Sequence, residues 1–120
     1  EEAFAAASGR AEALIVMPDS FLHNHHARIG DLAQRHRLPG RYPDPDYVRA
    51  GGLMSSATSV LAMGRRAAAF VDKILNGATP ADLPVEQAMK FQLLINLKAA
   101  KALGIPIPPH PLTWADEVIQ

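Results

Sequence analysis

The sequence predicts an α/β protein built on an open, parallel sheet. Short apolar runs that end at turn residues alternate along the chain with longer segments that have one apolar helical face. The first such run, residues 13–17, is apolar at successive positions and stops at Pro18, which is typical of a parallel strand buried on both faces. No internal repeat interrupts this alternation. These observations favour one sheet with helices between its strands.

The first half of the chain supplies most of this pattern. Residues 1–7 have the composition of a helix, and Gly9 follows as a C-cap, so we interpret this segment as the end of a helix whose start is missing. The apolar positions of residues 23–37 recur at helical spacing. Asp44 and Pro45 are typical of a helix start. We therefore expect strands at 13–17, 41–43 and 53–54, and helices at 23–37 and 44–50.

The second half begins with the clearest helix of the sequence. Apolar residues recur every three or four positions from Val60 to Leu75, and Asn76 with Gly77 ends the segment. Residues 91–97 alternate as a strand with one wetter face, and 97–103 form a short helix closed by Gly104. Four prolines then predict an extended segment, after which Thr113 is expected to cap a last amphipathic helix.

Composition excludes several classes of protein. The chain has 120 residues, enough for one compact domain. Twelve Lys and Arg balance twelve Asp and Glu, so there is no broad positive field and no nucleic-acid partner is expected. The absence of cysteine excludes disulfides, thiolate metal sites and a cysteine nucleophile. No apolar run approaches the roughly 20 residues of a membrane-spanning helix.

Polar and aromatic side chains follow the predicted strands at the edge where ligands of open α/β sheets bind. This edge is formed by the carboxyl ends of the parallel strands. Hydroxyls and a carboxylate at these positions suit hydrogen bonding to a small polar ligand. The candidate ligand-binding residues are Asp19, Ser20, Phe21, Tyr42, Ser55 and Ser56.

Other candidate chemistry is weaker. His23 and His26 share a helical face, and Asp19 could be a third metal ligand, but spacing places only two ligands, so we expect no metal site. Asp44 and Asp46 form a close carboxylate pair that helix capping explains. There is no phosphate-binding loop and no nucleophile paired with a base. We therefore predict a protein that is not an enzyme and needs no cofactor.

Several separated motifs resemble one family, the ABC transporter substrate-binding proteins that include tryptophan receptors. The resemblance extends over essentially all 120 residues and keeps the order of the family's motifs. It is carried by Gly51-Gly52-Leu53-Met54-Ser55, Arg65-Arg66-Ala67-Ala68, Pro80-Ala81-Asp82-Leu83-Pro84-Val85-Glu86-Gln87, Lys90-Phe91, Ile95-Asn96-Leu97-Lys98, Ala100-Lys101-Ala102-Leu103-Gly104 and Ala115-Asp116-Glu117-Val118-Ile119.

The resemblance implies a truncated lobe of a type I periplasmic-binding-protein fold with a C-terminal return segment. Residues 1–79 would be part of the second lobe, and residues 80–120 would return to pack on a missing first lobe. Such proteins are extracytoplasmic, with the signal peptide in the missing N-terminal part, and deliver a small organic solute to an ABC permease in the membrane. Two copies of the fragment could also dimerise by covering surfaces that the first lobe would otherwise hide.

The resemblance also suggests roles for the site residues. Pro18-Asp19-Ser20 matches the family's Pro-Asp-Pro loop, and Ser56 stands where the family has Tyr. Asp19 would suit the amino group of an amino-acid-like solute, and Ser55 or Ser56 its carboxylate, although Asp19 could equally serve only as a helix cap. The lost aromatic ring favours a smaller or more polar solute than an aromatic amino acid. A ligand-sensing input domain of a regulator, with the same fold, is the alternative function.

Overall fold

The computed structural model describes residues 1–87 and 91–120, which form two compact units. The first unit comprises Glu1–Ala57 together with Gln92–Gln120, and the second comprises Thr58–Phe91. The chain therefore leaves the first unit after Ala57 and re-enters it at Gln92. The lobe boundary expected between residues 79 and 80 refers to a longer receptor and stays a prediction.

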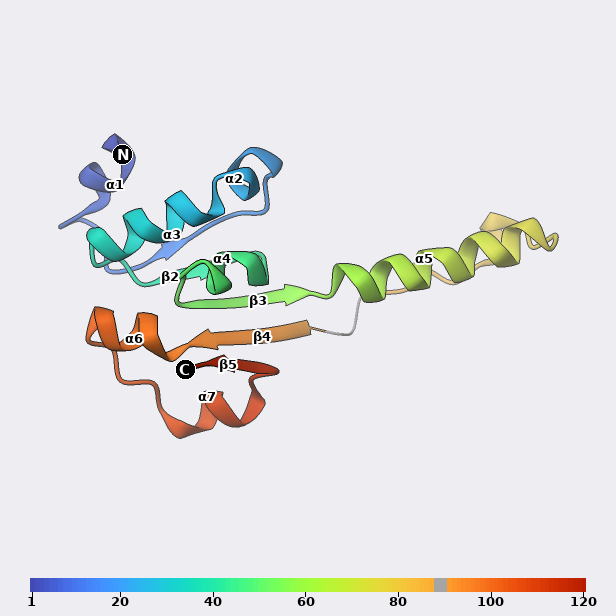
Figure 1. Ribbon diagram of the computed structural model, residues 1–120. Coiled ribbons are helices and arrows are strands. Elements are labelled where there is room, and N and C mark those ends of the chain that lie inside the picture. The colour runs from blue at the N-terminus through green and yellow to red at the C-terminus, as the bar shows by residue number, and fades with distance from the viewer. Residues whose placement is uncertain (88–90) are drawn as a thin grey trace. The chain divides into compact units, whose positions relative to one another are not determined.

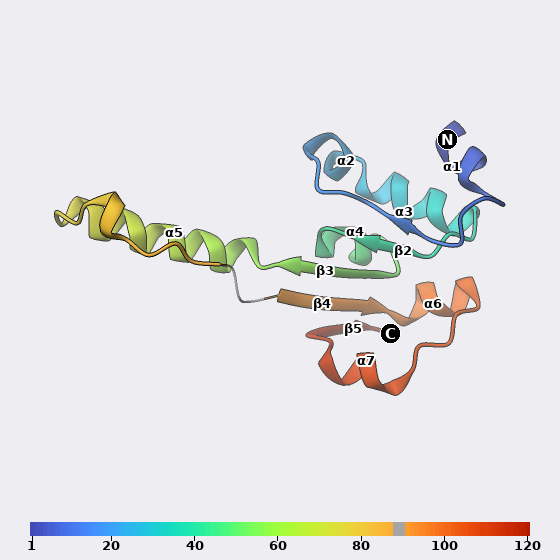
Figure 2. The ribbon, with the colours of Figure 1, turned by 180° about the vertical axis from the view of Figure 1, so that it is seen from behind.

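A five-stranded sheet with the order β1-β2-β3-β4-β5 confirms the predicted α/β class. The pairs β1–β2, β2–β3 and β4–β5 are parallel, whereas the arrows of β3 and β4 point in opposite directions (Figures 1 and 2). The sheet is thus mostly parallel. Its strands are β1 (Leu14–Ile15), β2 (Gly40–Tyr42), β3 (Met54–Thr58), β4 (Phe91–Asn96) and β5 (Glu117–Ile119).

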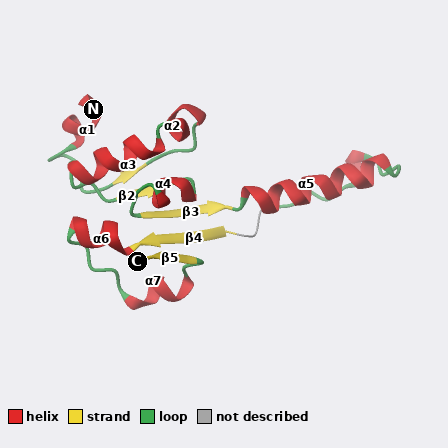
Figure 3. Cartoon of the chain, in the orientation of Figure 1, coloured by secondary structure: helices red, strands yellow, loops and turns green. Residues whose placement is uncertain are grey.

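Six short helices accompany the strands of the first unit (Figure 3). Asp19 and Asp44 cap two of them, each by accepting a backbone N–H bond, and Gly104 ends a third in the left-handed conformation that glycine adopts at low cost. The expected helix 23–37 is divided in two at His25. The helices are α1 (Glu2–Ala7), α2 (Ser20–Asn24), α3 (His26–Arg35), α4 (Pro45–Arg49), α6 (Leu97–Leu103) and α7 (Pro109–Trp114).

The helix expected after Thr113 is wrong. The preceding residues 109–114 form α7 instead, which has proline in its first turn, and residues 117–119 form strand β5. Ile119 pairs with Asn96 and Val118 with Ile95 in parallel register. The free edge of β4 is occupied in this way, and the backbone hydrogen bonds gained there outweigh the local helical pattern that the sequence shows.

The burial of the side chains on two strands also differs from the expectation. The segment of β1 was expected to be buried on both faces, but Val16 is buried while Ile15 and Met17 are about two-thirds exposed. Ile15 and Met17 point to the face opposite Val16, so that face is largely exposed. On β4, the face expected to be wetter carries Leu94 and Asn96, which are 2% and 5% exposed. Both β4 faces are therefore buried toward its C-terminal end.

Two apolar clusters form the core of the first unit. One joins Val16, Tyr42 and Tyr47, and the other joins Leu53 with Ala99 and Ala100 of α6. The buried Asn96 connects these regions, because its Nδ2 donates to the Val48 carbonyl at 3.0 Å while its Oδ1 accepts from the Ala99 amide at 3.0 Å. One side chain thus caps α6 and holds it to the end of α4.

The ring of Tyr42 fits only because two neighbouring residues are glycines. A Cβ at Gly40 would lie 2.5 Å from the Tyr42 hydroxyl, and a Cβ at Gly52 would lie 2.6 Å from the ring and 2.8 Å from the Tyr47 carbonyl oxygen. Atoms do not approach this closely without displacement. These glycines therefore set the position of the aromatic core beneath the strand ends.

The second unit consists of the long helix α5 (Val60–Leu75) and the segment that follows it, which contains the 3-10 turn η1 (Pro80–Asp82). Helix α5 has the bounds that its apolar period predicted, and Ser59 caps it by accepting from the Ala62 amide. None of the sixteen residues of α5 is buried. Among residues 1–87 and 91–120, no helix combines the length and apolar character needed to cross a bilayer.

Candidate functional site

The ends of β1 and β2 bring two carboxylates to one edge of the sheet. The strands are parallel, with Ile15 paired to Arg41, so the loops that follow them, at Asp19 and Asp44, emerge at the same edge. Each carboxylate uses one oxygen to accept a backbone N–H at the start of a helix, at 2.9 Å for Asp19 and 2.8 Å for Asp44. Capping accordingly occupies one oxygen of each side chain.

Tyr47 lies beneath this edge and is not among the site residues predicted from the sequence. Its ring stacks on Tyr42 with centroids 5.1 Å apart and meets the rings of His23 and His26 edge-on at 6.2 and 5.8 Å. The residue is completely buried, and its hydroxyl has no hydrogen-bond partner among the described residues. Its position three residues after the capping Asp44 is the sequence signal that could have identified it.

The electrostatics of Tyr47 connect it with both strand ends. Burial raises the pKa of its hydroxyl, and the carboxylates of Asp44 and Asp19 raise that pKa further. Burial likewise raises the pKa of Tyr42 to about 12, with a smaller contribution from Tyr47. Both hydroxyl groups therefore stay protonated and can donate hydrogen bonds at ordinary pH. The Tyr47 hydroxyl also lies in the electric field of the Asp19 and Asp44 carboxylates.

The two predicted serines lie within β3, because that strand continues to Thr58 and does not end at Ser56. Ser55 pairs in register with Tyr42 and is completely buried, and its hydroxyl has no partner in the described part of the chain. Ser56 is half-buried, and its carbonyl accepts a hydrogen bond from Arg41 at 2.6 Å. A buried hydroxyl without a partner costs about 1–3 kcal/mol, so Ser55 holds unused hydrogen-bonding capacity next to Tyr42.

The remaining predicted residues differ in exposure. Ser20 opens α2 and is exposed, and Phe21 is 69% exposed with its ring 4.6 Å from that of His25. Tyr42 is only 1% exposed, so a contact between its side chain and a ligand stays a prediction. The structure therefore brings Asp19, Ser20 and Phe21 together in one exposed loop and helix start.

The histidines of this loop are occupied by local contacts. The rings of His23 and His26 stack with centroids 5.6 Å apart, and Nδ1 of His26 lies 2.8 Å from the His23 carbonyl oxygen. Nδ1 of His25 is 2.8 Å from the Phe21 carbonyl oxygen. Within residues 1–87 and 91–120, no group of three His, Asp or Glu side chains is placed to hold a metal ion.

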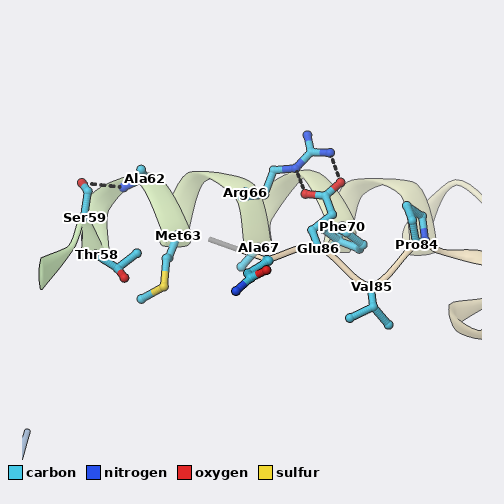
Figure 4. A pocket seen from close by; sticks show the side chains of 11 residues that line it. Thr58, Ser59, Ala62, Met63, Arg66, Ala67, Phe70, Pro84, Val85 and Glu86 are labelled. Atoms are coloured by element: carbon cyan, nitrogen blue, oxygen red, sulfur yellow. Dashed lines mark hydrogen bonds and ion pairs between the residues drawn. The ribbon is translucent and has the colours of Figure 1, made fainter. Parts of the chain in front are cut away.

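A cavity of about 600 Å³ lies in the second unit, between α5 and residues 84–87 (Figure 4). Its wall is largely apolar, with Met63, Phe70 and Val85, and is crossed by the ion pair between Arg66 and Glu86. The Arg66 hydrogen bond lowers the pKa of Glu86. None of the six side chains selected from the sequence lines this cavity.

Comparison with known proteins defines the class to which this fold and site belong. The family model described as ABC transporter substrate binding protein matches residues 1–119. The chain therefore belongs to the ABC transporter substrate-binding protein family, as its motifs indicated. A comparison with curated proteins gave no match.

Solved structures agree with this assignment. An ABC domain from Streptococcus pneumoniae in complex with L-Trp is 27% identical, with a TM-score of 0.86, and a conserved domain protein from Vibrio cholerae is 26% identical, with a TM-score of 0.85. Each match covers 98% of this chain and 40% of the other. A ligand-free, open substrate-binding protein with adhesive properties from Clostridium difficile, at 21% identity and a TM-score of 0.73, shares the fold. The chain thus spans about 40% of the length of the structures it matches.

Proposed function

We propose that this chain forms one side of the solute cleft of an extracytoplasmic ABC-type receptor, and that the solute is a small amino-acid-like molecule. The observation that carries the proposal is the family match over residues 1–119, in a fold that leaves the buried hydroxyls of Tyr47 and Ser55 without hydrogen-bond partners among the described residues. The L-Trp in the pneumococcal relative supports an amino acid as the class of ligand. No catalytic step or cofactor is part of the proposal.

The chemistry of the strand ends suits the two charged groups of an amino acid. The Asp19 carboxylate has an oxygen beyond the one that caps α2, and this oxygen would accept from an ammonium group. The hydroxyls of Ser55 and Ser56 would donate to a carboxylate. Phe21 offers an exposed apolar surface to a side chain, and Tyr42 supports the serines from the neighbouring strand. Ser56 provides no aromatic surface, which favours a small or polar solute.

Function would follow from closure of two lobes around the solute. Contacts made by both lobes stabilise the closed form, and this form is presented to the membrane permease.

The experiment is a titration of the isotopically labelled chain with L-amino acids, including L-Trp, followed by backbone amide NMR. Because one lobe supplies only part of the contacts, we expect binding in the millimolar range, with shifts confined to residues 19–21 and 55–56. Asp19→Asn keeps the helix cap, since asparagine caps as well as aspartate, but removes the charge. It should weaken binding about tenfold, as expected for the loss of a charge-assisted hydrogen bond.

The matched control is Asp31→Asn, which removes an exposed carboxylate that pairs with Arg35 on α3. This variant should bind like the wild-type chain. Equal weakening by both variants would show a nonspecific charge effect and contradict the role of Asp19. An absence of shifts at the strand ends for every amino acid would refute an amino-acid-like solute at this site.

A further inference from the structure

The long helix α5 carries a second apolar face that the cavity does not use. Leu61, Gly64, Ala68, Val71 and Leu75 follow one another at alternating spacings of three and four residues, the repeat of helices that pair along their length. Leu61, Val71 and Leu75 are 66%, 54% and 81% exposed. We call these five residues the α5 stripe. None of them lines the cavity between α5 and residues 84–87.

The centre of the stripe allows a close approach. A Cβ added at Gly64 would meet no atom within 4 Å, so the space above this residue is open. Ala68 is also exposed. Packed helices lie about 8–10 Å apart, depending on the side chains at the contact, and small residues permit the shorter distances. The stripe is therefore shaped for another helix, with a hollow at its middle and large side chains at its ends.

The stripe is self-complementary when two copies run antiparallel. A two-fold axis beside Ala68 places Leu61 opposite Leu75 of the second copy, and it places the hollow at Gly64 opposite Val71. The residues that flank the stripe on one side are Arg65 and Asp72, and the same axis places them opposite each other. Flanking charges of this kind set the partner and orientation of paired helices. In a parallel pair this flank would face the opposite flank of the second helix, so Arg65 and Asp72 would not meet.

Within residues 1–87 and 91–120, neither charge is fully used. Arg65 has no ion-pair partner there, and the Asp72 carboxylate accepts only from the side-chain amide of Asn76, at 3.2 Å. We propose that α5 is the contact surface for a second copy of this chain, paired antiparallel through the α5 stripe with Arg65 facing Asp72 of the other copy. The proposal does not depend on the identity of the solute.

Sedimentation velocity over a concentration series tests the association. The wild-type chain should approach twice its mass of 12.9 kDa as its concentration rises. Arg65→Asp creates two repulsive pairs in place of two attractive ones and should weaken the dimer about tenfold. The double variant Arg65→Asp with Asp72→Arg restores opposite charges and should restore the dimer. Arg10→Asp makes the same change of charge at an exposed turn of the other unit and should have no effect.

Single cysteines test the orientation, because the chain has no cysteine of its own. Ala68→Cys places two thiols beside the two-fold axis and should form a disulfide-linked dimer under mild oxidation. Leu61→Cys should not link to itself, but should link to Leu75→Cys when the two variants are mixed. All three substituted positions are exposed, so folding should be retained and can be checked by circular dichroism.

Each result decides the proposal. A reversible dimer that Arg65→Asp weakens and the charge exchange restores, together with linkage at Ala68→Cys, supports it. Self-linkage of Leu61→Cys would show a parallel pair and overturn it. A chain that stays monomeric at all concentrations, without linkage at Ala68→Cys, would also overturn it and would leave the α5 stripe to another segment of a longer polypeptide.

Discussion

Asn96 offers the sharpest test of how the first unit is held together. It is 5% exposed and makes two hydrogen bonds of 3.0 Å, one to the Val48 carbonyl and one from the Ala99 amide. Asn96→Ala removes a helix cap worth about 1 kcal/mol and the hydrogen bond to the Val48 carbonyl, worth about 0.5–1.5 kcal/mol because that carbonyl still accepts from the Gly51 amide at 3.1 Å. The free energy of unfolding should therefore fall by about 1.5–2.5 kcal/mol.

The assay is urea unfolding followed by far-ultraviolet circular dichroism, with the dependence on urea compared between variants. Asn96→Ser retains an oxygen that can cap α6 but cannot reach the Val48 carbonyl, so it should lie between the wild type and Asn96→Ala. Hydrogen exchange at the Ala99 amide should quicken in Asn96→Ala and remain slower in Asn96→Ser. These two readouts separate the cap from the bond to α4.

The matched control is Asn76→Ala at the end of α5, because Asn76 donates to the Asp72 carbonyl at 2.9 Å in an exposed position. Its effect should stay within about 0.5 kcal/mol, as for most surface substitutions. An Asn96→Ala effect of the same size would refute the reasoning, since it would mean that neither buried bond contributes to stability.

Three further predictions concern the strand-end region. Gly52→Ala forces a Cβ to within 2.8 Å of the Tyr47 carbonyl oxygen, so it should lower the free energy of unfolding measured in urea by about 1–3 kcal/mol. The control Gly64→Ala has open space above it and should be neutral or stabilising by up to about 1 kcal/mol. Equal effects of the two substitutions would contradict the close packing at Gly52. Burial raises the pKa of Tyr42 from 10.0 to about 12, because the folded state holds the hydroxyl proton more tightly than the unfolded state does. The contribution of this proton to the free energy of unfolding is complete below pH 10.0 and is lost as the pH rises to about 12. The difference in unfolding free energy between wild type and Tyr42→Phe should therefore change by up to about 2 kcal/mol over this range, and a constant difference would exclude the shift. Ser55→Ala removes a buried hydroxyl that has no partner among the described residues, so the free chain should be as stable as the wild type or more stable in thermal unfolding. The same substitution should weaken amino-acid binding measured by NMR. A loss of stability of more than about 1 kcal/mol would show that the hydroxyl already has a hydrogen-bond partner.

Much of the fold could be predicted from the sequence because its signals are local. Helix α5 begins and ends at the predicted residues, since its apolar period, its serine cap and the Asn76–Gly77 end act within a few positions of one another. The caps at Asp19 and Asp44 and the left-handed Gly104 are equally local. The family could also be predicted from the sequence, because its motifs occur in the family's order, and the family model matches residues 1–119.

The tertiary structure decided the features that depend on distant partners. Residues 117–119 form a strand because β4 offers them an edge, and no local pattern encodes that edge. Tyr47 becomes part of the candidate site because stacking on Tyr42 and proximity to both strand ends bury its hydroxyl, although its own segment indicates only a short helix. The hydroxyl of Ser55 is buried without a hydrogen-bond partner because β3 pairs with β2, which places Ser55 beside Tyr42, thirteen positions earlier in the sequence. Only the assembled sheet reveals this pairing.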